Sequence, residues 1–381
     1  MYRVPAGKGW FVVLRLSRRD VMMNGRVIFS ILCLLMVLVG CTHLGPQTVP
    51  RDRFDYNTAI ADSWKAQTLL NIVKLRYADM PLFVEVASVV SGYTLEGSVT
   101  LGGTVSSEAA VQGDFLALGT AGKYTDRPTI TYAPITGAKF NENFMTPIPP
   151  SAVLFLMQSG WRVDVIFPIV VESINGLRSR QASASDQRLG DPEYYDVVTL
   201  LRKIQQSGAV GMRIVKETDS KNTTVLFFHR ENIASEITKA RMELNQLLGL
   251  DPDRQEVNVT YGLIAQGENE IAMLTRSILQ IMVNLATQID VPSEHVSNGL
   301  TIPSLPTPAG EETMLKQLIR VRCGPDKPEN AFTAVKYEDH WFWIEKNNFQ
   351  SKRTFAFLMI LFSLTETGGK EGLPLVTIPA G

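Results

Sequence analysis

The chain has 381 residues, with 37 basic and 38 acidic side chains and a formal net charge of −1. This balance excludes a strongly basic surface of the kind that attracts nucleic acid, so no nucleic-acid partner is expected. The length allows two domains, or one large domain, with a substantial hydrophobic core.

Residues 1–21 precede a second candidate start. Met22 or Met23, followed by Arg26, would open a signal sequence of ordinary length with one positive charge ahead of its apolar segment. Residues 1–21 are therefore interpreted either as a mis-assigned start or as part of the protein, and the fold prediction leaves them out.

An apolar run at residues 27–39 ends in the tetrapeptide Leu38-Val39-Gly40-Cys41. The run is short for a helix that crosses a bilayer, but it suits the apolar part of a secretory signal with a small residue at the cleavage point. This combination resembles a bacterial lipoprotein signal peptide. The alternative is an uncleaved anchor helix that carries the tetrapeptide by chance.

The resemblance implies that residues 22–40 are removed and that Cys41 is lipidated, which anchors the protein to a membrane. In the enterobacterial family an Asp after the cysteine retains a lipoprotein in the inner membrane, and here Thr42 follows. The implied location is the periplasmic face of the outer membrane. Cys323 is then the one remaining thiol, and we expect it to be a small buried hydrophobe rather than a nucleophile.

The first part of the mature chain is predicted to be rich in strands. Residues 41–53 are polar and lack periodicity, which predicts a lipidated tether. Residues 54–180 are predicted to form an N-terminal α+β region with Gly-rich strands. It begins with a helix at 55–79 and continues with a two-faced strand at 93–105, where the period changes to two. Further strands are expected at 115–124 and 129–132.

The polar, Ser-rich residues 178–190 form the best candidate linker. They would lead to a C-terminal α+β domain at 191–381, interrupted by a Pro-rich loop at 298–310. The helical spacing of apolar residues is strongest at 268–289. Other helices are expected at 192–207, 232–248 and 349–364, and strands at 209–216, 223–229, 256–264, 318–323, 332–337, 341–344 and 375–378.

Helices interleaved with short strands predict an α+β fold, in which short mixed or antiparallel sheets pack against amphipathic helices. The usual catalytic signatures, such as G-x-S-x-G, a Walker loop, H-E-x-x-H and C-x-x-C, are absent from the sequence. No catalytic residue, metal or cofactor is predicted. A metal site would need histidines to converge, which their spacing does not indicate; they stand at positions 43, 229, 295 and 340.

Two segments could form binding surfaces. Strand alternation places Trp341 and Trp343 on one face and Phe342 and Ile344 on the other. If the tryptophans are exposed, they would make a stacking platform for sugar rings or for apolar groups of a partner. The alternative, which we favour, is that both faces are buried.

The second segment is the hairpin at residues 93–124. It could be part of an ordinary sheet with one wet face, or it could join copies from other subunits in an export channel. Its arms are long enough to span a membrane, but two of seven positions on the candidate lipid-facing side, Gly97 and Gly103, are glycines. We therefore predict that the hairpin packs on the soluble body or lies in the periplasm.

These observations favour an outer-membrane-anchored periplasmic lipoprotein with a scaffold, adaptor or envelope-assembly role. Its expected partners are the membrane, through the lipid, and an envelope protein or a second copy of the chain. One alternative is a subunit of an oligomeric outer-membrane export channel. Another is an envelope hydrolase whose active site has no local motif.

Overall fold

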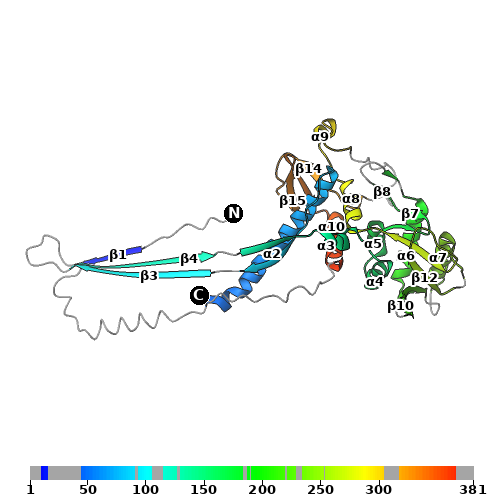
Figure 1. Ribbon diagram of the computed structural model, residues 1–381, viewed down its shortest axis with the longest axis horizontal. Helices are drawn as coiled ribbons and strands as arrows, with labels where there is room; N and C mark the ends of the chain where they lie inside the picture. Colours follow the sequence, from blue (N-terminus) through cyan, green and yellow to red (C-terminus); the bar gives the residue numbers. More distant parts are fainter. Residues whose placement is uncertain are drawn as a thin grey trace, which may run out of the picture. The chain divides into compact units, whose positions relative to one another are not determined.

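The computed structural model describes most of the chain after residue 43 (Figure 1). Its contacts divide the chain into two compact units. The ribbon unit comprises Met1–Thr58, Glu85–Ala133 and Leu375–Gly381, and the α+β unit comprises Ala59–Val84 and Pro134–Pro374. The described residues are 10–15, 44–90, 93–104, 115–126, 129–182, 187–188, 190–218, 221–228, 234–252, 254–303 and 317–365.

Several sequence predictions lie outside the described residues. These are the signal at 22–40, the lipidated Cys41, the strand at 375–378 and most of the Pro-rich loop. Among the helices that the structure describes, none has both the length and the apolar character needed to cross a bilayer.

In the ribbon unit the three predicted strands, together with β2 (Val84–Val90), which was not predicted, form the two arms of an antiparallel hairpin. β3 (Tyr93–Thr104) pairs with β4 (Phe115–Asp126), and β2 pairs with β5 (Thr129–Pro134). The strand predictions for this region are therefore confirmed. β1 (Trp10–Arg15) pairs with β4 as a third strand. These residues belong to the segment 1–21, which the fold prediction left out.

The register of β3 and β4 pairs all twelve residues of each strand without a bulge. It sets Glu96 opposite Lys123, whose charged groups lie 3.5 Å apart, and Leu95 opposite Tyr124. Cross-strand partners share a face, so Glu96 and Lys123 lie on one face of the hairpin, and both are exposed.

The helix predicted at 55–79 is longer at its N-terminus than expected. α2 spans Leu44–Arg76, so residues 44–53 are helical rather than an irregular tether. Pro46 lies in the first turn, where the N–H that proline lacks would have no partner within the helix. The prediction of an irregular tether over these residues is wrong.

A six-stranded mixed sheet forms the larger layer of the α+β unit. Its strand order is β10-β11-β12-β13-β6-β7, and only β12 and β13 run parallel. This arrangement confirms the predicted α+β class with mixed sheets. The strands are β6 (Val171–Ile174), β7 (Leu177–Arg178), β10 (Val210–Thr218), β11 (Lys221–Phe228), β12 (Glu256–Tyr261) and β13 (Glu270–Thr275).

Helices cover this sheet and close its apolar core. Leu154, Phe167, Leu201 and Leu248, one from each of four helices, meet at a small apolar hole lined also by sheet residues such as Ile271. β6 and β7 belong to the same sheet as the later strands, so the two compact units do not divide at the predicted linker, 178–190. The helices are α4 (Pro150–Gln158), α5 (Val163–Val170), α6 (Pro192–Gln206) and α7 (Ser235–Leu248).

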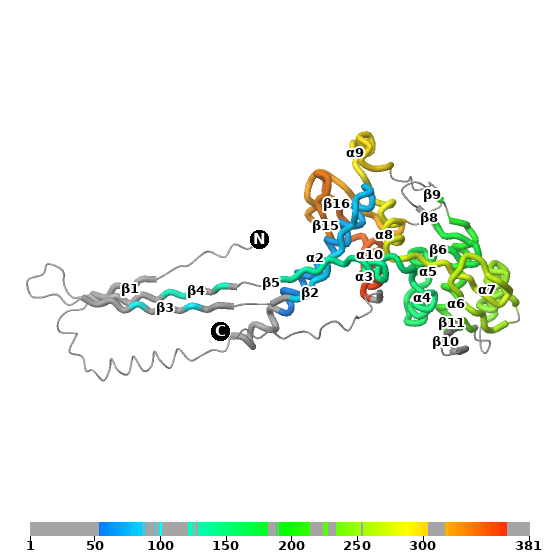
Figure 2. The backbone as a smooth tube through the Cα atoms, viewed as in Figure 1, coloured from blue at the N-terminus to red at the C-terminus, as the bar shows by residue number. Residues whose placement is uncertain are grey.

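A smaller antiparallel sheet, ordered β14-β16-β15, follows in the same unit (Figure 2). Its strands are β14 (Arg322–Gly324), β15 (Ala331–Tyr337) and β16 (His340–Glu345). The other elements are α3 (Gly137–Phe140), η1 (Asn141–Met145), α8 (Ile278–Ala286), α9 (Ser293–Ser297), α10 (Phe349–Thr365) and the short strands β8 (Gln181–Ala182) and β9 (Gln187–Arg188).

The prediction of one long helix at 268–289 is wrong. The segment forms strand β13, a sharp change of direction, and then helix α8. β13 lies inside the sheet, and its residues 271–273 are all buried. A strand that is buried on both faces has a continuous apolar sequence, which the spacing of apolar residues does not distinguish from a helix. Ser277 starts the helix, because its side chain accepts from the Gln280 N–H while the Gln280 side chain accepts from the Ser277 N–H.

Candidate functional site

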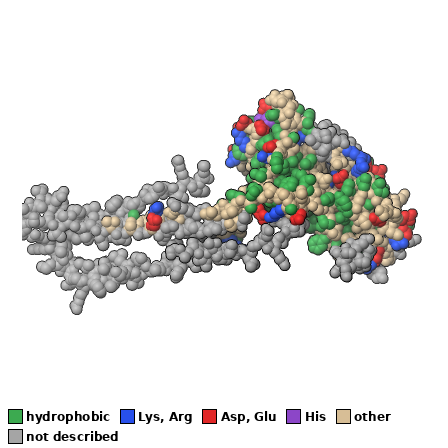
Figure 3. All heavy atoms as spheres, in the orientation of Figure 1, with side chains coloured by type: hydrophobic (Ala, Val, Ile, Leu, Met, Phe, Trp, Pro, Cys, Tyr) green, Lys and Arg blue, Asp and Glu red, His purple; other side chains and the backbone are tan. Residues whose placement is uncertain are grey.

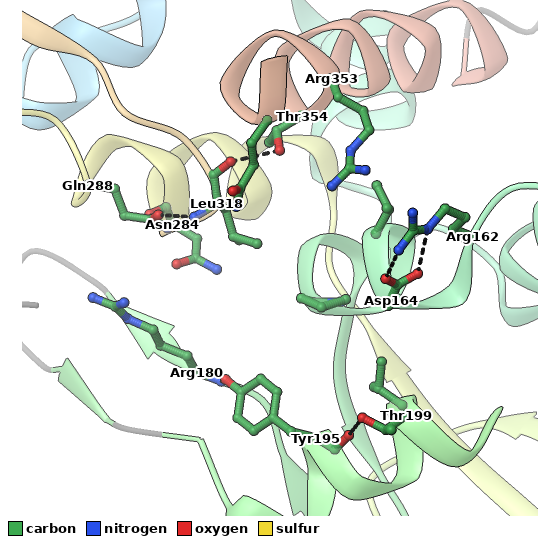
Figure 4. Close-up of a pocket in the computed structure, with 14 residues that line it drawn as sticks. Arg162, Asp164, Arg180, Tyr195, Thr199, Asn284, Gln288, Leu318, Arg353 and Thr354 are labelled. Carbon is green, nitrogen blue, oxygen red and sulfur yellow. Dashed lines mark hydrogen bonds and ion pairs between the residues drawn. The ribbon is translucent and has the colours of Figure 1, made fainter. Parts of the chain in front are cut away.

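A polar pocket of about 280 Å³ lies in the α+β unit (Figure 4). Its walls come from α5 and the residue before it, from Arg180 two residues after β7, and from α6. The rest comes from α8 and the segment that follows it, from Leu318 and from α10. The lining residues include three arginines and one carboxylate. They are Arg162, Asp164, Val165, Pro168, Arg180, Tyr195, Val198, Thr199, Asn284, Gln288, Leu318, Gln350, Arg353 and Thr354.

Asp164 is already neutralised by arginines. Arg162 binds it through two contacts, Nε to Oδ1 at 3.0 Å and Nη2 to Oδ2 at 2.5 Å, and Arg202 Nε lies 3.6 Å from Oδ1. Burial alone would raise the pKa of Asp164, but the hydrogen bonds and charge of Arg162, with the charge of Arg202, hold it below its usual 3.8. The single pocket carboxylate is therefore ionised and shared.

Two further arginines keep their charge available to the pocket. Among the described residues, no carboxylate forms an ion pair with Arg180 or Arg353, and Arg353 Nε is buried without a hydrogen bond. Burial lowers the pKa of Arg180, although a guanidinium still stays charged at neutral pH. A desolvated cation without a counter-ion favours binding of an anion from solution.

The backbone of Arg180 is held from both sides. Its N–H donates to the Tyr195 hydroxyl oxygen at 3.1 Å, and its carbonyl accepts from Arg276 Nη2 at 3.0 Å. Gly190 lies against this bond, since a Cβ atom there would come within 2.7 Å of both Arg180 N and Tyr195 Oη. These contacts fix the point from which the Arg180 side chain enters the pocket (Figure 4).

Arg276 is a structural arginine below the pocket, only 2% exposed. Its Nη1 lies 3.2 Å from the carbonyl oxygen of Ile169 and 3.3 Å from that of Val171, and its Nη2 donates to Ser179 Oγ at 2.7 Å. Ile169 lies in the last turn of α5, whose carbonyls have no partner within the helix and favour a positive charge. Arg276 therefore joins the β13–α8 junction to α5 and β7.

Amide side chains form the opposite wall. The Gln288 side-chain oxygen already has a partner, because Oε1 accepts from the Leu318 N–H at 2.7 Å. Asn284 is only 5% exposed, and its Oδ1 has no hydrogen bond among the described residues. This oxygen can only accept, so a bound oxyanion would not satisfy it, whereas the NH2 group of the same amide can donate to an oxyanion. Figure 4 shows Asn284 on the side facing Arg180.

The site can bind an oxygen-rich anion, because guanidinium groups donate several N–H bonds in a plane to carboxylate or phosphate oxygens. None of its arginines was predicted from the sequence.

Cys323 is half-buried and free, and burial, followed by the charge of Asp290, raises its pKa to about 11, which disfavours the reactive thiolate. It lies outside the pocket lining.

Trp341 and Trp343 share one face of β16, and both are half-buried. Their neighbours Phe342 and Ile344 are fully buried on the other face. Lys327 Nζ lies 5.4 Å from the centre of the Trp341 ring, and a Cβ at Gly324 would lie 3.2 Å from the Trp343 ring. The alternation is confirmed, with the tryptophan face half-buried and the other face fully buried. The stacking platform stays a prediction.

Of the four histidines, His43 and His229 lie outside the described residues. The structure brings His295 and His340 together, with ring centres 4.7 Å apart, although they are far apart in the sequence.

In comparisons with known proteins, no family model matches the chain, and no curated protein or solved structure is significantly similar to it.

Proposed function

We propose that this protein is an outer-membrane lipoprotein, held on the periplasmic face by lipid on Cys41, and that it acts as an adaptor in an envelope assembly. In this role the α+β unit binds an anionic group of its partner, a carboxylate or a phosphate, in the arginine pocket. The observation that carries the proposal is Arg180, a desolvated guanidinium with no described carboxylate partner that lines the same pocket as Arg353.

The anchor is tested with the Cys41→Ser variant. The sulfur of Cys41 is the group that would receive the lipid, so this variant should lose labelling by a fatty-acid probe and should stay unprocessed or fractionate as soluble. Equal labelling of the variant and the wild type would refute the lipoprotein assignment.

The pocket is tested with inorganic phosphate as the probe. Phosphate should raise the melting temperature of the wild type above that seen with chloride at equal ionic strength, because a ligand that binds only the folded state stabilises it. Arg180→Gln should remove this shift. Arg213→Gln is the matched control, since Arg213 pairs with Glu256 at 2.6 Å on the surface outside the pocket. An equal shift in both variants would reject the pocket.

A second candidate, a subunit of an oligomeric export channel, is favoured by one observation. β3 and β4 pair over twelve residues each without a bulge, and transmembrane strands need roughly 9–11 residues. The lead proposal predicts that the hairpin stays outside the membrane. Cysteines placed at Val99 and Ser98 in a Cys323→Ser background test this. Labelling of residue 99 only by lipid-soluble reagents, and of residue 98 only by water-soluble ones, in an SDS-resistant oligomer would favour the channel.

A further inference from the structure

A cluster of three potential metal ligands lies away from the arginine pocket. Glu294 and His295 come from α9, and His340 comes from the first position of β16, directly after the β15–β16 turn. One ligand atom from each of the three residues lies within 4.8 Å of the other two. Figure 2 shows α9 and the β15–β16 hairpin as neighbours in the fold.

Both histidines have their Nδ1 atoms occupied. Nδ1 of His295 lies 2.7 Å from the Tyr77 hydroxyl oxygen, and Nδ1 of His340 lies 3.3 Å from the Glu338 carbonyl oxygen. A carbonyl oxygen can only accept, so the contact with Glu338 favours the tautomer with a proton on Nδ1, in which Nε2 can bind a metal. The Tyr77 oxygen can accept from His295 in the same way. This pattern is the one found around metal-bound histidines, where an outer partner fixes the ring and its tautomer.

The Nε2 atom of His340 faces a carboxylate. It lies 3.3 Å from Glu294 Oε1. Two ligands bound tetrahedrally to Zn²⁺, each about 2.0–2.1 Å from the metal, are separated by about 3.3 Å. The pair therefore already has the spacing of two zinc ligands. One ligand atom of His295 lies within 4.8 Å of both, so metal binding requires His295 to move closer to the pair.

The exposure of the three residues suits a site that opens to solvent. His295 is 6% exposed, whereas the Glu294 side chain is 63% exposed. The His295 ring is held by its Nδ1 contact with Tyr77, and its ring centre lies 4.7 Å from that of His340. Figure 3 shows histidine at the surface of this region, close to acidic side chains.

We propose that Glu294, His295 and His340 bind a divalent first-row metal ion, with Zn²⁺ preferred, through two Nε2 atoms and one carboxylate oxygen. Imidazole ligands select against Mg²⁺ and Ca²⁺, which take oxygen ligands. The fourth position is open to water. The ion would join α9 to the β15–β16 hairpin and, through Tyr77, to the turn that follows α2.

Titration of tag-free full-length protein with Zn²⁺ in a calorimeter tests the proposal. Glu294→Gln should weaken this binding at least about tenfold, because it removes a charged ligand on an exposed side chain without threatening the fold. Asp339→Asn is the matched control. It removes one carboxylate charge next to His340, but Asp339 is 97% exposed and pairs with Lys336, so affinity should change less than about twofold.

A second pair of variants tests the tautomer argument. Tyr77→Phe removes the partner of His295 and should weaken Zn²⁺ binding about 10–100-fold. Tyr337→Phe removes a neighbouring hydroxyl that donates to Asp79 at 3.1 Å, and it should leave affinity unchanged. Co²⁺ in place of Zn²⁺ should give the visible absorption of a four-coordinate site in wild type and lose it in Glu294→Gln.

Two results would overturn the metal site. One is wild-type protein that binds no Zn²⁺ at micromolar concentrations, which would leave the cluster as a hydrogen-bonded His–Glu contact. The other is Zn²⁺ binding that Glu294→Gln does not weaken, which would place the ion elsewhere on the chain.

Discussion

The Arg180 N–H and the Tyr195 hydroxyl oxygen, 3.1 Å apart, connect a half-buried cation of the pocket to the first turn of α6. Tyr195→Phe removes this acceptor and should weaken phosphate binding while lowering stability by about 1 kcal/mol. Phosphate titration and urea unfolding measure the two effects. Tyr194→Phe is the comparison, since its hydroxyl bonds to the Phe167 carbonyl at 3.0 Å and lies outside the pocket lining. That variant should lose stability but keep phosphate affinity.

Gly190→Ala should disturb the same bond by steric contact. The added Cβ would lie 2.7 Å from Arg180 N and Tyr195 Oη, which forces backbone or side chain to shift. A cost of about 1–3 kcal/mol and weaker phosphate binding are expected. Gly267→Ala meets no atom within 4 Å and should stay within about 0.5 kcal/mol of wild type. Equal melting temperatures for the two variants would show that Gly190 has room for a side chain.

Alanine substitutions on the two faces of β16 should lower the free energy of unfolding by different amounts. Phe342→Ala should cost about 3–5 kcal/mol in urea unfolding, because Phe342 is fully buried and its loss leaves a cavity. Trp341→Ala should cost clearly less, because Trp341 is half-buried and is covered on one side by the flexible side chain of Lys327. A loss at Trp341 as large as that at Phe342 would place the tryptophan face in the core.

Cys323 should react slowly at mildly alkaline pH. With its pKa raised to about 11, the thiolate fraction at pH 8 is about 100-fold lower than for a thiol at the usual 9.0. Iodoacetamide labelling, followed by mass spectrometry of the peptide that contains Cys323, measures this. The raised pKa also means that the neutral thiol stabilises the fold below pH 9 and that this contribution is lost as pH rises toward 11. Labelling as fast as in the unfolded chain would contradict both statements.

The sequence predicted elements well where one face of an element meets solvent. β3 and β4 kept their period of two, and α6 begins after Asp191 with Pro192 at its first position, as expected. The failure at 268–289 came from burial on all sides, which erases the difference between strand and helix periods. The Ser277-x-x-Gln280 capping box was visible in the sequence and marks the true start of α8.

The candidate sites could not be predicted in the same way. Arg162, Arg180 and Arg353 reach one pocket from three distant parts of the chain, and His295 and His340 meet only because α9 lies against a hairpin turn. No spacing rule links such positions, because their distances are set by tertiary packing rather than by the period of a helix or strand.

The hairpin segment Glu85–Ala133 is inserted into the sequence of the α+β unit between Phe83 and Ile135, which are hydrogen-bonded to each other. The Ile135 N–H donates to the Phe83 carbonyl at 2.9 Å, one residue before β2 begins and one residue after β5 ends. The hairpin is thus an insertion whose ends are closed by the host, so its length adds little to the closure entropy of folding. Replacement of Glu85–Ala133 by a short turn should therefore leave the melting of the α+β unit nearly unchanged. Hairpins of other lengths could be exchanged at this junction during evolution without a new core.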